Sequence, residues 1–188
     1  MTEHPIIPPL TEDAISELKA GDRVLITGSL LTARDEAHRR LDRLLAEGRD
    51  LPIDLKGQIL YYVGPAPPRP GEPVGSAGPT SSYRMDSVTP GLLAIGLKGM
   101  IGKGQRSEEV RKAIVEHRAV YFAAVGGAGA LLARKILQVE VLAYPELGPE
   151  AIFRMQVKDF PCVVINDRFG GDLYQEGKRR YRKVELRK

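Results

Sequence analysis

Short apolar runs, separated by polar or glycine-containing turns, recur along most of the chain, and we expect each to form a β-strand. Each run has four to six residues. That length is too short for most helices and is typical of buried strands. The runs occupy residues 23–28, 58–63, 92–95, 120–125, 139–143, 152–157 and 162–165.

Apolar residues at helical spacing predict helices between several of these strands. The clearest case is a helix that follows Thr32 and ends at Gly48, because Thr32 and Asp35 have the spacing of a capping box. Its apolar face would be formed by Ala37, Leu41, Leu44 and Leu45. Further helices are expected over residues 11–19, over residues 80–88, after a cap at Ser107, and in a final helix opened by the glycines at 126–129.

The order of these elements favours a single layered α/β domain. Helices and strands alternate at first, whereas the later half is richer in strands, which favours a mixed sheet over a purely parallel one. A Pro/Gly-rich loop at residues 64–79 has no periodic signal, and loops of this length are often functional. We expect an extended segment at residues 1–10, one folded domain at 11–175 and a basic tail at 176–188.

Composition excludes several classes of function. The 188 residues are 43% hydrophobic and 28% charged, as in ordinary globular proteins with a core of their own. The net charge of +4 is mild, and the absence of Trp argues against a nucleic-acid partner. No apolar stretch approaches the roughly 20 residues of a membrane span, and the first residues do not resemble a signal peptide. We therefore expect a cytoplasmic protein without membrane contact.

Cys162 is the only cysteine of the chain, and it lies in an apolar run. One cysteine cannot form an intramolecular disulfide, nor a zinc or iron–sulfur site built from the cysteines of a single chain. We expect a buried thiol on a strand and no metal site in this chain.

Hydrogen-bond donors gather at residues 78–86, where Gly-Pro precedes three hydroxyl residues. If a helix begins there, Thr80 and Ser81 lie beside free N–H groups at the positive end of its dipole, which suits an anion. Arg84 follows Thr80 by four residues, would share its helix face, and could clamp a carboxylate through two parallel hydrogen bonds. An ordinary capped helix with Arg84 paired to Asp86 or to solvent fits the same residues.

Two further cations lie at predicted element junctions. Lys103 stands between two glycines, where a ligand could approach closely, although the segment lacks the spacing of a phosphate-binding loop and a plain turn fits it as well. Arg34 lies beside a predicted cap, with Asp35 able to orient it, but a surface ion pair fits it too. Together, Arg34, Arg84 and Lys103 would suit a small dianion.

Several ordered motifs resemble class I iron–sulfur fumarases, and in particular the β subunit of the two-subunit forms. They are Thr-Ala-Arg-Asp-Glu-Ala-His-Arg at residues 32–39, Gly-Pro-Thr-Ser-Ser-Tyr-Arg-Met-Asp at 78–86 and Ile-Gly-Lys-Gly-Gln-Arg-Ser at 101–107. Later landmarks follow at 125–130, 144–148 and 159–161, so the likeness spans residues 10–174. Ser81 replaces a frequent threonine and Gln105 a frequent asparagine.

The resemblance implies a fold, a reaction and a set of site residues. The fold would be a swivelling β/β/α domain, and the reaction the reversible hydration of fumarate to (S)-malate. Arg34, Arg84, Lys103 and Ser81 would bind substrate, while Thr80 would lie at the reacting carbon as the catalytic residue.

The resemblance also implies a partner. A fumarase α subunit would carry a [4Fe-4S] cluster on its own cysteines, with none of the cluster ligands from this chain, and the two chains would form an α2β2 heterotetramer.

Removal of a proton beside one substrate carboxylate builds negative charge there, which fixed cations stabilise in the transition state.

Three alternatives remain at this point. The β subunit of L-tartrate dehydratase shares the chemistry, but members of that group tend to carry Glu and Gly where this chain has Asp86 and Gln105. A mesaconate-type hydratase differs in pocket walls that the partner would supply. A non-catalytic anion-binding module would use the same cations without a partner.

Overall fold

The computed structural model describes residues 3–182 of the chain, and in that part the strands form one mixed sheet. The sheet has seven strands in the order β1-β2-β3-β4-β5-β7-β6. Their bounds are Glu3–Ile6 (β1), Arg23–Thr32 (β2), Ile59–Tyr61 (β3), Gly99–Gly102 (β4), Val120–Ala123 (β5), Ile136–Ala143 (β6) and Ile152–Asn166 (β7). The fold class predicted from the sequence, a single α/β domain with a mixed sheet, is confirmed.

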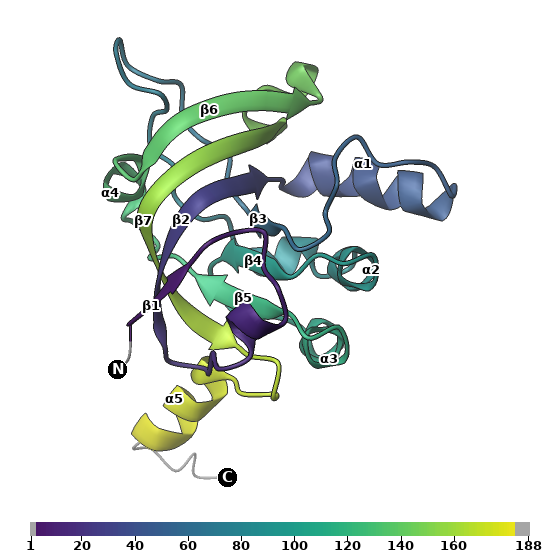
Figure 1. The fold of residues 1–188 in the computed structure, drawn as a ribbon, viewed down its shortest axis with the longest axis vertical. Helices are drawn as coiled ribbons and strands as arrows, with labels where there is room; N and C mark the ends of the chain where they lie inside the picture. Colours follow the sequence, from purple (N-terminus) through teal and green to yellow (C-terminus); the bar gives the residue numbers. More distant parts are fainter. Residues whose placement is uncertain (1–2, 183–188) are drawn as a thin grey trace, which may run out of the picture.

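The long strand β7 closes this sheet into a barrel-like ring. It pairs antiparallel with β5 on one side and with β2 on the other, so that β2, β3, β4, β5 and β7 form a closed circuit. The strands β1 and β6 pair outside that circuit, with β2 and β7 respectively. Figure 1 shows β7 and β2 curving side by side through the molecule.

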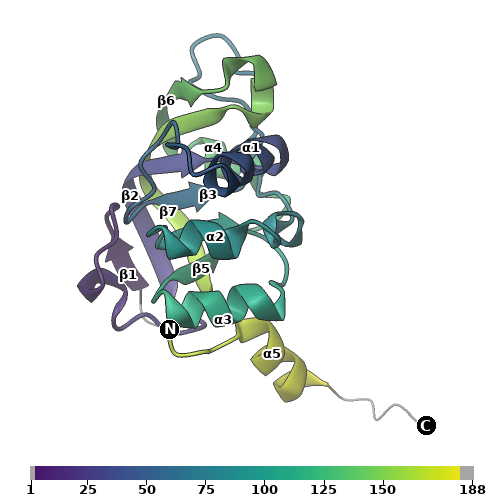
Figure 2. The ribbon, with the colours of Figure 1, turned by 90° about the vertical axis from the view of Figure 1, so that its right-hand side faces the viewer.

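The helices α1, α2 and α3 lie together along one side of the sheet, as Figures 1 and 2 show from two directions. The α-helices are Asp35–Ala46 (α1), Thr89–Ala94 (α2), Glu108–Glu116 (α3), Gly129–Ala133 (α4) and Leu173–Tyr181 (α5). The 3-10 helices are Asp13–Ile15 (η1), Ser82–Met85 (η2) and Pro145–Glu150 (η3). In the part of the chain described here, none of the helices is long and apolar enough to cross a membrane.

Alternating residues of the central strands supply two separate cores. On β3, Tyr61 belongs to one core, whereas its neighbours Leu60 and Tyr62 belong to the other. On β5, Phe122 and Tyr121 divide in the same way. This is the two-residue period expected of strands that are covered on both faces. The second core is completed by apolar residues of α1, α2 and α3: Ala37, Leu41, Leu92, Leu93, Val110 and Ile114.

The strands β1 to β5 all run parallel, and this direction decides where the loops that follow them lie. The carboxyl ends of parallel strands meet at one edge of a sheet, where open α/β sheets place their ligands. The segments that follow β2, β3, β4 and β5 are therefore neighbours in space, although they are far apart in the sequence.

Three points of the predicted strand pattern need correction. Residues 92–94 belong to helix α2, and Ile95 follows as its C-cap. Pro90 stands in the first turn of this helix, where proline favours a helix start. Residues 99–102, where no strand was expected, form the buried strand β4. The runs 152–157 and 162–165 are parts of one strand, β7.

Four predictions about helices also need correction. Residues 80–88 do not form one helix, and the 11–19 segment contains only the short η1, although Thr11 does accept a hydrogen bond from the Ala14 amide. Thr32 does not cap α1, because its buried hydroxyl bonds to Ala151 and Phe153. The glycines at 126–129 lead into the short α4, which is not the final helix.

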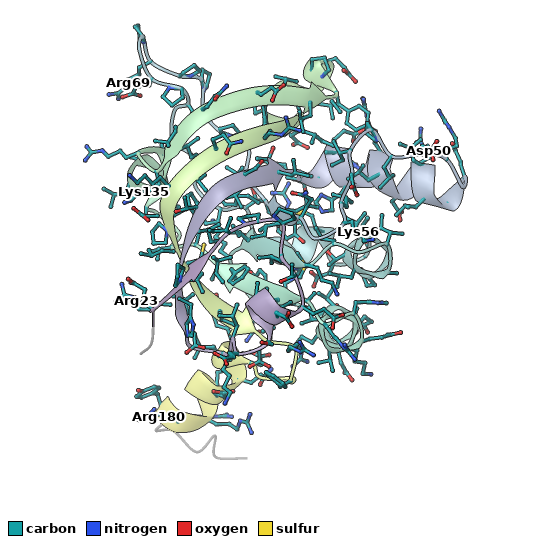
Figure 3. All side chains as sticks on the ribbon, in the orientation of Figure 1. Arg23, Asp50, Lys56, Arg69, Lys135 and Arg180 are labelled. Atoms are coloured by element: carbon teal, nitrogen blue, oxygen red, sulfur yellow. The ribbon has the colours of Figure 1, made fainter. Side chains whose placement is uncertain are left out.

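Other local predictions are confirmed. Ser107 caps α3 by accepting a hydrogen bond from the Val110 amide, and Cys162 is buried on β7. The loop at 64–79 has no helix or named strand, and it projects from the body, with Arg69 labelled on it in Figure 3. Helix α5 covers residues on both sides of the expected tail boundary at 176 and carries Arg180; residues 183–188 of that tail lie outside the described part.

Candidate functional site

The cations singled out in the sequence lie at the carboxyl ends of adjacent parallel strands. Arg34 follows β2, Lys103 follows β4, and Arg84 lies in η2, in the connection between β3 and β4. The connection after β5 reaches the same place, since a Cβ atom placed on Gly126 would lie 3.5 Å from Cδ of Lys103. The fold therefore brings the three predicted cations to one edge of the sheet.

Backbone hydrogen bonds fix Thr80 and Ser81 beside Lys103. The Thr80 amide donates to the Tyr62 carbonyl at 2.7 Å, which extends the chain beside β3. The Ser82 amide donates to the Lys103 carbonyl at 2.9 Å, and the Lys103 amide donates to the Thr80 carbonyl at 3.3 Å. The segment at 80–82 thus continues the sheet.

This pairing corrects the predicted anion site at a helix start. A segment whose amides are used by a sheet offers no row of free N–H groups, and the helix that follows it, η2, is a single 3-10 turn of four residues. Thr80 lies outside that turn and does not share a helix face with Arg84. The grouping of hydroxyls with cations remains, because Ser81 and Lys103 pair as neighbours in an isolated parallel bridge.

Asp35 joins the two arginines. Its Oδ2 lies 3.0 Å from Nε of Arg34, and its Oδ1 lies 2.8 Å from Nε of Arg84. The alternative in which Arg84 pairs with Asp86 is therefore wrong. Burial by itself would raise the pKa of Asp35, but the hydrogen bond from Arg34 and the charge of Arg84 outweigh it and hold that pKa below its usual value.

A second carboxylate holds Arg34 from the other side. Oε1 of Glu150, at the end of η3, lies 3.4 Å from Nη2 of Arg34. Its other oxygen, Oε2, accepts a hydrogen bond of 2.8 Å from the Glu36 amide in the first turn of α1. Glu150 therefore takes the role at the start of α1 that the sequence suggested for Thr32. The two residues are 114 positions apart, so no local pattern indicates the contact.

The guanidinium of Arg34 packs directly over Gly64, and this contact gives a way to move the arginine without removing it. A Cβ atom on Gly64 would lie 2.5 Å from Nη1 of Arg34, the far end of a flexible side chain. We expect Gly64→Ala to fold normally but to displace the guanidinium. In the two-chain enzyme that the resemblance implies, kcat/KM should fall about tenfold or more, since small misplacements of binding groups are costly.

The control for that variant is Gly91→Ala. A Cβ atom at Gly91 would meet Cδ1 of Leu45 at 3.8 Å, an ordinary contact. Steady-state kinetics and thermal unfolding of both variants check the expectation. Equal kcat/KM for wild type and Gly64→Ala would show that the position of Arg34 does not matter.

Arg106 was missed as an important residue by sequence reasoning, and it is the most deeply buried cation of the site region, with a side chain that is 0% exposed. Its Nε donates to Oδ1 of Asp86 at 2.7 Å, and its Nη2 donates to the Thr89 hydroxyl at 2.7 Å. The guanidinium carbon also lies 5.4 Å and 5.0 Å from the ring centroids of Tyr62 and Tyr121, within cation–π range.

The Arg106–Asp86 pair ties the two site segments together. The other oxygen of Asp86 accepts a hydrogen bond of 2.6 Å from the Ser107 amide, at the start of α3. The Tyr121 hydroxyl lies 2.8 Å from Oγ of Ser82 and donates to the Gly104 carbonyl at 2.9 Å. A buried polar network therefore connects the segment that carries Arg84 with the segment that carries Lys103.

His38 is a fully buried neighbour of the site. Its ring meets Tyr62 edge-on, and Nε2 has no hydrogen-bond partner among the described residues. Burial lowers its pKa from 6.5 to about 4, and the charge of Arg106 acts in the same direction. Below pH 6.5 the unfolded chain takes up a proton that the folded chain refuses, so stability is lost as pH falls from about 6.5 to about 4.

Because of this pKa shift, we expect His38 to make the free energy of unfolding decrease as the pH is lowered. Between pH 7 and pH 5 the free energy of unfolding should fall by about 2 kcal/mol more in the wild type than in His38→Gln. Urea unfolding at both pH values measures the difference, with His117→Gln on α3 as the control. A slope that survives in His38→Gln would contradict the assignment.

The described residues do not fit an iron–sulfur cluster or another metal centre of their own. Among residues 3–182, no three His, Cys, Asp or Glu side chains are grouped so that they could hold a metal ion. Cys162 is 5% exposed and belongs to the core inside the ring of strands. Burial raises the pKa of its thiol, which disfavours the thiolate that a metal requires.

Comparisons with known proteins show the family of the chain. The family model described as "Fumarase C-terminus" matches residues 5–177. Class I anaerobic fumarate hydratase of Escherichia coli K12 is 40% identical over 164 residues, which is 86% of this chain and 30% of that protein. Fumarate hydratase 2 of Leishmania major is 38% identical over 86% of this chain and 29% of its own length. The chain thus spans about a third of these longer relatives.

A relative of matching length is the putative L(+)-tartrate dehydratase subunit beta of Methanocaldococcus jannaschii. It is 36% identical over 182 residues, which is 93% of each chain. The family match over residues 5–177 includes every residue of the site described above. This chain belongs to the fumarase C-terminus family.

Proposed function

We propose that the chain is the β subunit of a two-subunit hydro-lyase that reversibly hydrates fumarate to (S)-malate. The observation that carries this proposal is the gathering of Arg34, Arg84 and Lys103 at the carboxyl ends of adjacent strands. Three cations fixed on one sheet edge suit a small dicarboxylate. The names of the longer relatives point to fumarate as that dicarboxylate.

In this proposal the chain acts by binding and by charge. The arginines and Lys103 hold the substrate carboxylates and hydroxyl, with Ser81 adding a hydroxyl beside Lys103. When a proton leaves the carbon next to one carboxylate, negative charge builds there in the transition state. Fixed cations stabilise this transition state more strongly than the ground state, and the chain would increase the reaction rate in this way.

Thr80 is proposed to lie at the reacting carbon. The hydrogen bonds that hold it belong to its backbone, which leaves its hydroxyl available to a ligand. An alcohol is a weak base unless a neighbour takes up its proton. We therefore propose that Thr80 relays a proton to a group of the partner chain.

The other half of the active site would come from a fumarase α subunit. A [4Fe-4S] cluster held by the cysteines of that subunit fits the absence of a ligand set among the described residues here. Exposed apolar side chains flank the site, with Tyr83 69% and Val125 67% exposed, and such residues are common in protein interfaces. We propose an α2β2 heterotetramer of cytoplasmic subunits, with residues 11–175 as a swivelling β/β/α domain.

A co-purification experiment tests the two-chain proposal. The tagged chain, expressed in its source cells, should retain a larger cysteine-containing protein that is brown under anaerobic conditions. The double variant Tyr83→Asp and Val125→Asp should release that partner, whereas Ile95→Asp, on an exposed apolar residue at the end of α2, should not. A chain that binds dicarboxylates tightly with no partner would instead be the non-catalytic anion-binding module.

The β subunit of L-tartrate dehydratase is the second candidate, and the relative of matching length favours it. Asp86 and Gln105 are the two positions at which the motifs of fumarases and L-tartrate dehydratases differ. Their surroundings in this structure are not alike. Asp86 pairs with buried Arg106, while Gln105 is exposed. An assay of the assembled enzyme distinguishes fumarate, L-tartrate and a mesaconate-type substrate.

A further inference from the structure

Asp35 occupies an unusual position, because one carboxylate serves two arginines that come from different elements. Oδ2 meets Arg34 and Oδ1 meets Arg84, in both cases through the Nε atom. Asp35 opens α1, whereas Arg84 lies in η2, so this contact connects the segment after β2 with the segment after β3. The side chain of Asp35 is 17% exposed and that of Arg84 is 43% exposed, so the contact is partly open to solvent.

The atoms used in these contacts determine which atoms are left. A guanidinium has five N–H donors in a rigid fork, and Nε supplies only one of them. Of the ion pairs among the described residues, Arg84 takes part in one, through Nε to Asp35. Arg34 uses Nε toward Asp35 and Nη2 toward Glu150. The Nη edge of Arg84 is thus left for a ligand.

We propose that Asp35 is a positioning residue that fixes the guanidinium groups of Arg34 and Arg84 relative to each other before a dicarboxylate binds. This inference rests on the proposed function of the same site. Each long side chain loses up to about 2 kcal/mol of rotamer entropy on being ordered. A site in which the folded protein has already ordered both arginines binds and stabilises charge better than a flexible one.

A purely structural role for Asp35 is the competing explanation. Asp35 lies in the first turn of α1, where a carboxylate interacts favourably with the helix dipole. In that case its removal would lower stability slightly and would not depend on Arg84. The two explanations therefore differ in whether the effects of Asp35 and Arg84 are coupled.

A double-mutant cycle in the reconstituted two-chain enzyme separates them. We expect Asp35→Ala to lower kcat/KM for fumarate about tenfold in the wild type and less than twofold in an Arg84→Ala background. Asp35→Glu should recover part of the loss, and Asp42→Ala, on the exposed side of the same helix, is the control. Equal losses in both backgrounds, or no loss from Asp35→Ala in the wild type, would overturn the proposal.

A second readout does not require activity. In the full chain labelled with 15N-arginine, the Nε–Hε signals of Arg34 and Arg84, assigned with Arg→Lys variants, should be protected from exchange at neutral pH. Both should broaden or disappear in Asp35→Ala. Signals that persist unchanged would refute the positioning role. If the signals behave as expected but the wild-type enzyme hydrates no dicarboxylate, the proposed function fails while the positioning role stands.

Discussion

Replacing Asp86 with alanine is expected to lower the free energy of unfolding of the chain by about 3–5 kcal/mol, because it leaves the buried charge of Arg106 without its partner. The side chain of Arg106 is 0% exposed and that of Asp86 is 12% exposed, so water cannot replace the lost carboxylate. The Ser107 amide at the start of α3 also loses its acceptor in this variant.

Urea unfolding of the full chain measures this effect. Glu108→Ala is the matched control, because it breaks an exposed ion pair with Lys112 on α3, and such exposed pairs contribute little to stability. Adding Arg106→Met to Asp86→Ala should recover much of the loss, since the uncompensated charge is then gone. A change below 1 kcal/mol for Asp86→Ala alone would mean that Arg106 finds another partner.

Arg84→Ala is expected to lower kcat/KM of the proposed two-chain enzyme by about 100-fold or more, the usual result of removing a group that stabilises charge in a transition state. The arginine side chain is 43% exposed, and its ion pair is with Asp35 at the surface of the site. Its loss should therefore change the free energy of unfolding by no more than about 0.5 kcal/mol.

Steady-state kinetics with fumarate and with malate, together with thermal unfolding of the variant, check both parts. Arg39→Ala is the control, because Arg39 is a 71%-exposed arginine of α1 that pairs with Glu36. Turnover close to wild type in Arg84→Ala would remove Arg84 from the site. A loss of activity accompanied by unfolding would assign Arg84 a structural role instead.

Local chemistry explains which parts of the fold could be predicted. The buried strands around Tyr61 and Phe122 are continuous apolar runs, and the cap at Ser107 depends only on residues within one turn. The apolar run at 92–95 was misassigned because four apolar residues fit a buried helix face as well as a strand. The region after Pro79 was misassigned because pairing with Lys103 overrides the helix-starting character of its hydroxyl residues.

The candidate site could be predicted only in part. Motifs in the sequence indicate its cations, but no local sequence pattern indicates the carboxylates that these cations contact. Arg34, Arg84 and Lys103 were named from the sequence, and the parallel strands bring them to one edge. The contacts Asp35–Arg84, Asp86–Arg106 and Glu150–Glu36 join residues that are far apart in the chain. Neither hydrophobic periodicity nor motif spacing in a single sequence indicates long-range contacts of this kind.

The most direct test of the central claim is an anaerobic hydration assay of the chain combined with its co-purified partner. Fumarate, mesaconate and L-tartrate would be offered to the pair and to each chain alone. We expect the pair to interconvert fumarate and (S)-malate, neither chain to do so alone, and tartrate and mesaconate to react far more slowly. Fast turnover of tartrate with none of fumarate, or fumarate hydration by the partner without this chain, would contradict this expectation.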